Sequence, residues 1–172
     1  MKAKLAHAYL AVCRRLDRVA LALCVAAGLF LTASVLAIVV LRYGFGTGFI
    51  ELQDAAAYAF AVLMAFSLPV TLARGGHVRV EVVSERLPPA YLRVADGAAL
   101  ALFLVPLFGL LIHAWWPDLA YSWSIREGSV ETGGLGGLFL VKTALPVAAA
   151  LMILQGIAQV LQRKAGADRD RS

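Results

Sequence analysis

Long apolar blocks alternate with short polar stretches along this chain. Four runs without Asp, Glu, Lys or Arg cover residues 19–41, 55–73, 97–116 and 143–162. Because an α-helix rises ~1.5 Å per residue, about 20 residues cross the ~30 Å hydrocarbon core of a bilayer. The pattern therefore predicts an all-α integral membrane protein with four transmembrane helices in a single domain (1–172), the fourth helix covering about 138–162.

The composition supports the same class. Of the 172 residues, 61% are hydrophobic and 16% are charged, whereas soluble domains are roughly half apolar and a quarter charged. A soluble core cannot bury this much apolar surface, but lipid solvates it from outside. The first run is longer than the ~7 to 15 apolar residues of a signal-peptide core, so we expect it to be retained.

The basic residues predict how the chain is oriented. All but three of the 16 Lys and Arg residues lie before the first run, between the second and third, or after the fourth. The exceptions are Arg42, Arg126 and Lys142. Under the positive-inside rule, both termini and the loop 74–96 are cytoplasmic, and loops 42–54 and 117–137 lie outside. The net charge of +5 then marks sidedness, and we do not expect nucleic acid as a partner.

The cytoplasmic loop includes an ionic segment, LARGGHVRVEVVSERLPPAYLR. Its Pro-Pro pair ends any helix that precedes it. Valines alternate through 78–82 as in a short strand, whereas Val80, Val83 and Leu87 fit one side of an interfacial helix. We favour the helix, because an isolated strand at a membrane surface leaves its edges unpaired.

The four runs contain too few titratable groups for catalysis or for binding a cofactor. His113 is the only histidine in a run, so facing helices cannot supply two axial ligands to a haem. No carboxylate lies at mid-span, and GxSxG, HExxH and P-loop patterns are absent from the sequence. Cys13 and Cys24 lack metal-ligand spacing, and we interpret them as small buried hydrophobes without a disulfide. We expect neither an enzyme nor a bound cofactor or metal.

The runs contain packing surfaces instead. Ala57, Ala61 and Ala65 recur every four residues and form a small-residue stripe, suited to close approach of another helix of this chain or of a partner. Gln155 and Gln159 form a polar stripe whose amides need partners away from lipid. An aromatic belt at the outer end of the third run comprises Trp115, Trp116, Tyr121 and Trp123. These features are typical of a protein that docks to another.

Five segments, in a fixed order, resemble a known family. They are RYGFG (42–46), LQD (52–54), RGGHVRVEVV (74–83), SWSIREGSVETGGL (122–135) and KTALPVAAALMILQGIAQ (142–159). Each is weak alone. Together, with four spans and both termini inside, they resemble the small permease subunit of tripartite ATP-independent periplasmic (TRAP) transporters, from the end of the first run to the end of the fourth.

The resemblance implies a secondary transporter of three parts in the bacterial cytoplasmic (inner) membrane. A periplasmic protein binds the substrate, a large permease subunit contains the transport path, and the small non-catalytic subunit pairs with the large one in the lipid bilayer. Uptake of an organic acid or related solute is driven by an ion gradient, usually of sodium. The small subunit is expected to be a scaffold, and a docking surface for the binding protein is a further option.

The motifs also name candidate interface or structural residues. Asp54 matches the acidic position of the family, whereas Gln53 and Glu51 stand where a second acid and a tryptophan are common. In the cytoplasmic motif, Glu81 stands where aspartate is usual. The other candidates are Arg42, Arg74, Gly75, Gly76, His77, Arg79, Trp123, Glu127, Lys142 and Gln155.

Two contacts follow as hypotheses. Arg42 and Asp54 lie at the outer ends of consecutive spans, and we expect them to pair across the first outer loop. The RGGHVRVE segment is expected to anchor the large subunit or lipid headgroups, with its glycine pair allowing a tight exit from the second span.

Three other classes remain as alternatives. A membrane anchor of a respiratory complex would bind haem or quinone, which the histidine content argues against. A stand-alone channel or exporter would line its own spans with polar residues. The small subunit of a tripartite tricarboxylate-type transporter has a similar role, and the RGGHVRVE segment is what favours the TRAP class.

Overall fold

The structure is a computed structural model that describes residues 2–74 and 89–169. Over these ranges the ordered elements are all helical, and four helical segments are long and apolar enough to cross a bilayer. The four segments are Ala8–Gly44, Ile50–Ala73, Gly97–Ser124 and Leu138–Gln162. The predicted all-α, four-span class is therefore confirmed.

Six helical elements make up these segments. They are α1 (Lys2–Gly44), α2 (Ile50–Ala73), α4 (Pro89–Ala99), the π-helix η1 (Leu100–Leu104), α5 (Val105–Ser124) and α6 (Leu138–Arg169). The elements α4, η1 and α5 follow one another without a break, so they form one helical rod. The predicted interfacial helix of the central loop lies in 75–88, outside the described residues.

All four helical segments extend beyond the predicted spans, and α6 continues to Arg169. α1 has 43 residues and is ~65 Å long, because Arg14, Arg15 and Arg18 are good helix formers and no proline interrupts them. α2 begins at Ile50, where Glu51 in its first turn complements the positive end of the helix dipole. α5 continues to Ser124, since Pro117 removes only one backbone hydrogen bond from a helix that is otherwise intact.

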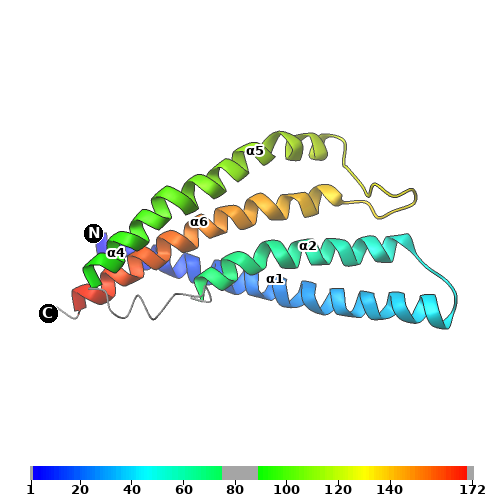
Figure 1. Cartoon of the computed structure of the whole chain (residues 1–172), viewed down its shortest axis with the longest axis horizontal. Coiled ribbons are helices and arrows are strands. Elements are labelled where there is room, and N and C mark those ends of the chain that lie inside the picture. Colours follow the sequence, from blue (N-terminus) through cyan, green and yellow to red (C-terminus); the bar gives the residue numbers. More distant parts are fainter. Residues whose placement is uncertain (1, 75–88, 170–172) are drawn as a thin grey trace.

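The helices lie side by side in a layer, in the order α1, α2, α6, α5 (Figure 1). α1 packs along α2, α2 along α6, and α6 along α5. At the end of the layer where α1 begins and α6 ends, α1 also contacts α6. We call this the terminal end, and we call the opposite end, where α1 joins α2 and α5 joins α6, the loop end.

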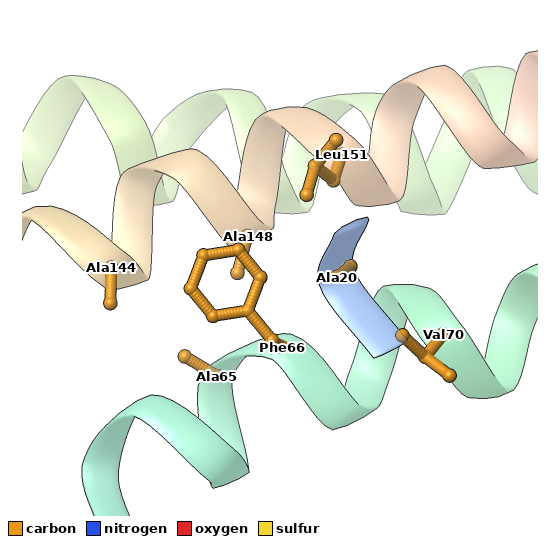
Figure 2. Close-up of a cluster of buried hydrophobic side chains, with 7 residues drawn as sticks. All are labelled: Ala20, Ala65, Phe66, Val70, Ala144, Ala148 and Leu151. Carbon is orange, nitrogen blue, oxygen red and sulfur yellow. The ribbon is translucent and has the colours of Figure 1, made fainter. Parts of the chain in front are cut away.

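The buried core lies between α1, α2 and α6. Figure 2 shows its seven members, with the ring of Phe66 projecting from α2 toward Ala148 of α6. Ala20 of α1 and Ala148 are each only 3% exposed. Four of the seven members are alanines, namely Ala20, Ala65, Ala144 and Ala148. Small side chains let the helix backbones approach closely, which stabilises helix pairs in lipid through van der Waals contact.

The π-helix η1 has a local cause. Pro106 lacks an N–H group, and in a regular α-helix its ring would meet the carbonyl of Leu102. The backbone widens just before it, where the N–H of Val105 bonds the carbonyl of Leu100, five residues back. α6 passes this segment at Gly156, where a Cβ would lie 2.8 Å from a methyl of Leu100.

Candidate functional site

At the loop end, a charged cluster joins α5 to α6. Lys142, in the first turns of α6, places its Nζ 2.7 Å from Oε2 of Glu127 and 3.1 Å from Oδ2 of Asp118. The same Nζ donates a hydrogen bond to Oγ of Ser122 at 3.0 Å, and the fully buried Ser122 hydroxyl donates to Glu127. One ammonium group therefore meets two carboxylates and a hydroxyl, which satisfies all three of its donors.

This cluster holds Glu127 in its ionised form. The hydrogen bonds from Lys142 and then from Ser122 lower the pKa of the Glu127 carboxyl below its ordinary value, and they outweigh the opposing effect of desolvation. Glu127 lies in the loop after α5, so the cluster also fixes where that loop leaves the helix. Asp118 and Ser122 were missed by sequence reasoning. Their four-residue spacing on one face of a helix is the signal that could have indicated them.

Two tryptophans reinforce the same junction. The indole of Trp123 donates to Oγ1 of Thr143 at 3.0 Å, and its ring meets that of Phe139 edge to face, with centroids 4.8 Å apart. The indole of Trp115 donates to the carbonyl of Lys142 at 3.2 Å. That carbonyl has no helical donor, because its partner four residues on would be Pro146. Trp115 therefore supplies the hydrogen bond that the proline removes.

The loop between α5 and α6 folds back onto the start of α2. Oδ2 of Asp54 accepts the Leu135 N–H at 2.9 Å, and the hydroxyl of Tyr58 donates to the Leu135 carbonyl at 2.9 Å. The Ser129 N–H donates to the same carbonyl. Asp54 and Tyr58 are four residues apart, so they project from one face of α2 and hold both polar groups of one loop residue.

The glycines of GGLGG explain how this contact forms. Gly133 and Gly137 have φ angles of +83° and +93°, which favour glycine. At Gly134, a Cβ would overlap the Asp54 carboxylate and the Ser129 side chain. The glycines therefore let the loop backbone approach α2 closely at Asp54.

The expected ion pair between Arg42 and Asp54 is not formed. None of the ion pairs within the described part of the chain joins them, and Asp54 binds the Leu135 amide instead. Arg42 is exposed in the last turn of α1, where its charge complements the negative end of the helix dipole. The Asp54 carboxylate thus accepts a hydrogen bond from the backbone of a loop residue 81 positions further along the chain.

At the terminal end, polar side chains bond helix backbones. The buried amide of Gln155 donates to the carbonyl of Cys13 at 3.0 Å, and Tyr9 donates to the carbonyl of Leu154 at 2.7 Å. Gln159 donates to the carbonyl of Leu72, in the last turn of α2. The two glutamines therefore bind α6 to α1 and to α2.

The other candidate residues lie in different surroundings. A guanidinium nitrogen of Arg74 lies 3.5 Å from Oδ2 of Asp17 in α1. Of the alanine stripe, Ala65 is buried in the core, whereas Ala57 and Ala61 are exposed. His113 is exposed as well. Gly75, Gly76, His77, Arg79 and Glu81 lie outside the described residues.

Among the described residues, these polar side chains form contacts between helices and loops. Within residues 2–74 and 89–169, no three His, Cys, Asp or Glu side chains gather as a metal site would require. Cys13 is buried, Cys24 is partly buried, and both are free thiols.

Four apolar helices of membrane-spanning length, held together by small residues and helix-bridging polar groups, define a multi-pass membrane protein. The sequence model of the DctQ component of tripartite ATP-independent periplasmic transporters matches residues 31–165. The match covers well over half of the chain, which therefore belongs to this family, the small permease component of TRAP transporters. No curated protein matches the sequence individually. Asp54, Glu127, Lys142 and Gln155 all fall within the matched range, whereas Tyr9 and Cys13 do not.

Proposed function

We propose that this chain is the non-catalytic small membrane subunit of a TRAP-type secondary transporter, and that it pairs with a large permease subunit in the bacterial cytoplasmic membrane. The complex takes up an organic acid or related solute that a periplasmic binding protein delivers, and an ion gradient, usually of sodium, drives the uptake. Both termini lie in the cytoplasm. The loop end, with the cluster around Lys142, then faces the periplasm and the binding protein.

The observation that carries this proposal is the exposed small-residue surface of α2. Ala57 and Ala61 lie one helical turn apart and are both exposed, whereas Ala65 is buried against this chain's own core. In lipid, small residues stabilise a helix pair only when a second backbone approaches them. Because α1 and α6 pack on other faces of α2, we assign Ala57 and Ala61 to a helix of the large subunit.

A co-purification assay tests the pairing. We expect Ala61→Leu to reduce recovery of the large subunit with the tagged chain and to reduce solute uptake, because the leucine keeps the partner backbone at a distance. Ala33→Leu is the matched control, since Ala33 is an exposed alanine of α1. Equal recovery of the large subunit with both variants would contradict the assignment of this surface.

A further inference from the structure

Three arginines of α1 face away from the other described helices. Arg14, Arg15 and Arg18 are all exposed, and successive residues of an α-helix are about 100° apart, so the three lie within an arc of about 100°. Cys13 and Ala20, which contact α6 and the core, lie on the opposite side of the helix. Within the part of the chain that the structure describes, these arginines therefore do not hold the four helices together.

The depth of the three arginines matches the headgroup layer of a bilayer. Arg18 directly precedes the uncharged run 19–41, and Arg14 is four residues, or ~6 Å, further along the axis. The polar layer on each side of the hydrocarbon core is roughly 5 to 8 Å thick. All three guanidinium groups can thus reach lipid phosphates when the run spans the core.

An exposed apolar stripe continues from the arginines along the same side of α1. Val25, Leu29 and Leu36 are 54%, 69% and 61% exposed, and their spacing places them within the same arc as the arginines. The surface therefore combines a basic end with an apolar length, which is the chemical form that complements an anionic phospholipid.

This surface borders an acidic side chain that already has a basic partner on another element. Asp17 lies beside the arc and directs its Oδ2 to Arg74 at 3.5 Å. A depression of about 430 Å³ lies between the arginines, and Ala11 and Asp17 line it as well. The Asp17 carboxylate therefore borders the site, where its ion pair with Arg74 offsets its charge. The small side chain of Ala11 leaves room there for a headgroup. Guanidinium groups bind phosphate oxygens with two parallel hydrogen bonds, which lysine cannot do.

We propose that this face of α1 binds an anionic phospholipid, with its phosphate on Arg14, Arg15 and Arg18 and an acyl chain along Val25, Leu29 and Leu36. The site lies outside the range 31–165 that the family shares, except for Leu36. It does not depend on the proposed transporter role, because it requires only that α1 spans a membrane.

Native mass spectrometry of the full-length chain tests this proposal. Phosphatidylglycerol and phosphatidylcholine are added in equal amounts to the detergent-purified protein, and the bound lipid is counted. We expect wild type to prefer phosphatidylglycerol by on the order of tenfold or more, since each basic residue near an anionic surface contributes to attraction. The variant Arg14→Gln/Arg15→Gln/Arg18→Gln should lose this preference. The control Arg163→Gln/Lys164→Gln/Arg169→Gln removes equal charge from the terminal end and should keep it.

If the arginine variant does not insert into the membrane, the lipid preference of wild type is measured at increasing NaCl concentrations instead. The preference should fall as NaCl increases, because salt screens contacts between exposed charges. A preference that is insensitive to salt, or equal in wild type and the arginine variant, would overturn the proposal. If the arginine variant kept its lipid preference but lost the large subunit on co-purification, the face would be a protein interface, and the lipid proposal would be wrong.

Discussion

The membrane-spanning segments that contain α5 and α6 are similarly apolar, but they differ in how much of their surface the protein buries. Half of the most apolar stretch of α6 is buried within the protein, and none of the corresponding stretch of the rod that contains α5 is. Ala148 and Ala158 of α6 are 3% and 1% exposed, whereas Phe103 of η1 and Leu110 of α5 are 72% and 66% exposed. Hydropathy predicts that both cross the membrane, but it does not distinguish the core helix from the peripheral one.

The difference is one of side-chain size. Alanines and Gly156 make up most of the buried face of α6, together with Pro146, Leu151, Met152 and Gln155, whereas α5 presents leucines and tryptophans outward. In water, large apolar residues would be buried first. In lipid they gain little from burial against another helix, so small residues that permit close backbone contact occupy the core. We therefore interpret small residues on an exposed face, such as Ala57 and Ala61, as a contact surface for a further helix.

The largest expected effect comes from enlarging a buried alanine of α6, compared with an exposed alanine of α5. Ala148→Leu should destabilise the protein by about 1 to 3 kcal/mol, because the added carbons must displace Phe66 from the core. Ala114→Leu, at an exposed position of α5, should change stability by less than about 0.5 kcal/mol. Thermal unfolding in one detergent measures both. Equal losses would show that α5 is packed as tightly as α6.

A smaller effect separates the glycines of the two helices. A methyl group added at Gly109 of α5 would meet no atom within 4 Å, so Gly109→Ala should stabilise the protein by about 0.5 to 1 kcal/mol through helix propensity. At Gly156 of α6 the same methyl meets Leu100 and Leu104. Gly156→Ala should gain less than Gly109→Ala, or lose stability, in the same unfolding assay. The reverse order would contradict the close contact between η1 and α6.

The smallest effect concerns the charged cluster that attaches α5 to α6. Because the folded protein lowers the pKa of Glu127, the stabilisation is fully present above the unfolded pKa of roughly 4.3 and is lost as pH falls through the folded pKa. Glu127→Gln should therefore reduce the unfolding temperature at pH 7, and the gap to wild type should close on acidification. Glu131→Gln, at an exposed loop position, is the control. A gap that stays constant with pH would exclude this ionic contribution.

Much of the fold could be predicted from the sequence. When an uncharged run of about 20 residues crosses lipid, its backbone N–H and C=O groups must be hydrogen-bonded within a helix. The helix ends could not be predicted, since Arg14 to Arg18 of α1 are compatible with either a helix or a polar leader. The partners of Asp54 and Gln155 were also beyond prediction. Both bind backbone groups, the Leu135 N–H and the Cys13 carbonyl, of a kind that nearly every residue carries. Which backbone group each side chain binds depends on how the helices and loops pack in three dimensions.

Site-specific photo-crosslinking tests the central claim, that the exposed alanines of α2 receive the large subunit. A benzophenone amino acid is placed at Ala61, or at Val25 on the outward stripe of α1 as control, in cells that produce all transporter components. We predict a covalent adduct between the Ala61 variant and the large permease subunit, and none from the Val25 variant. No adduct from position 61, or an adduct from position 25 alone, would contradict this account of how the chain docks.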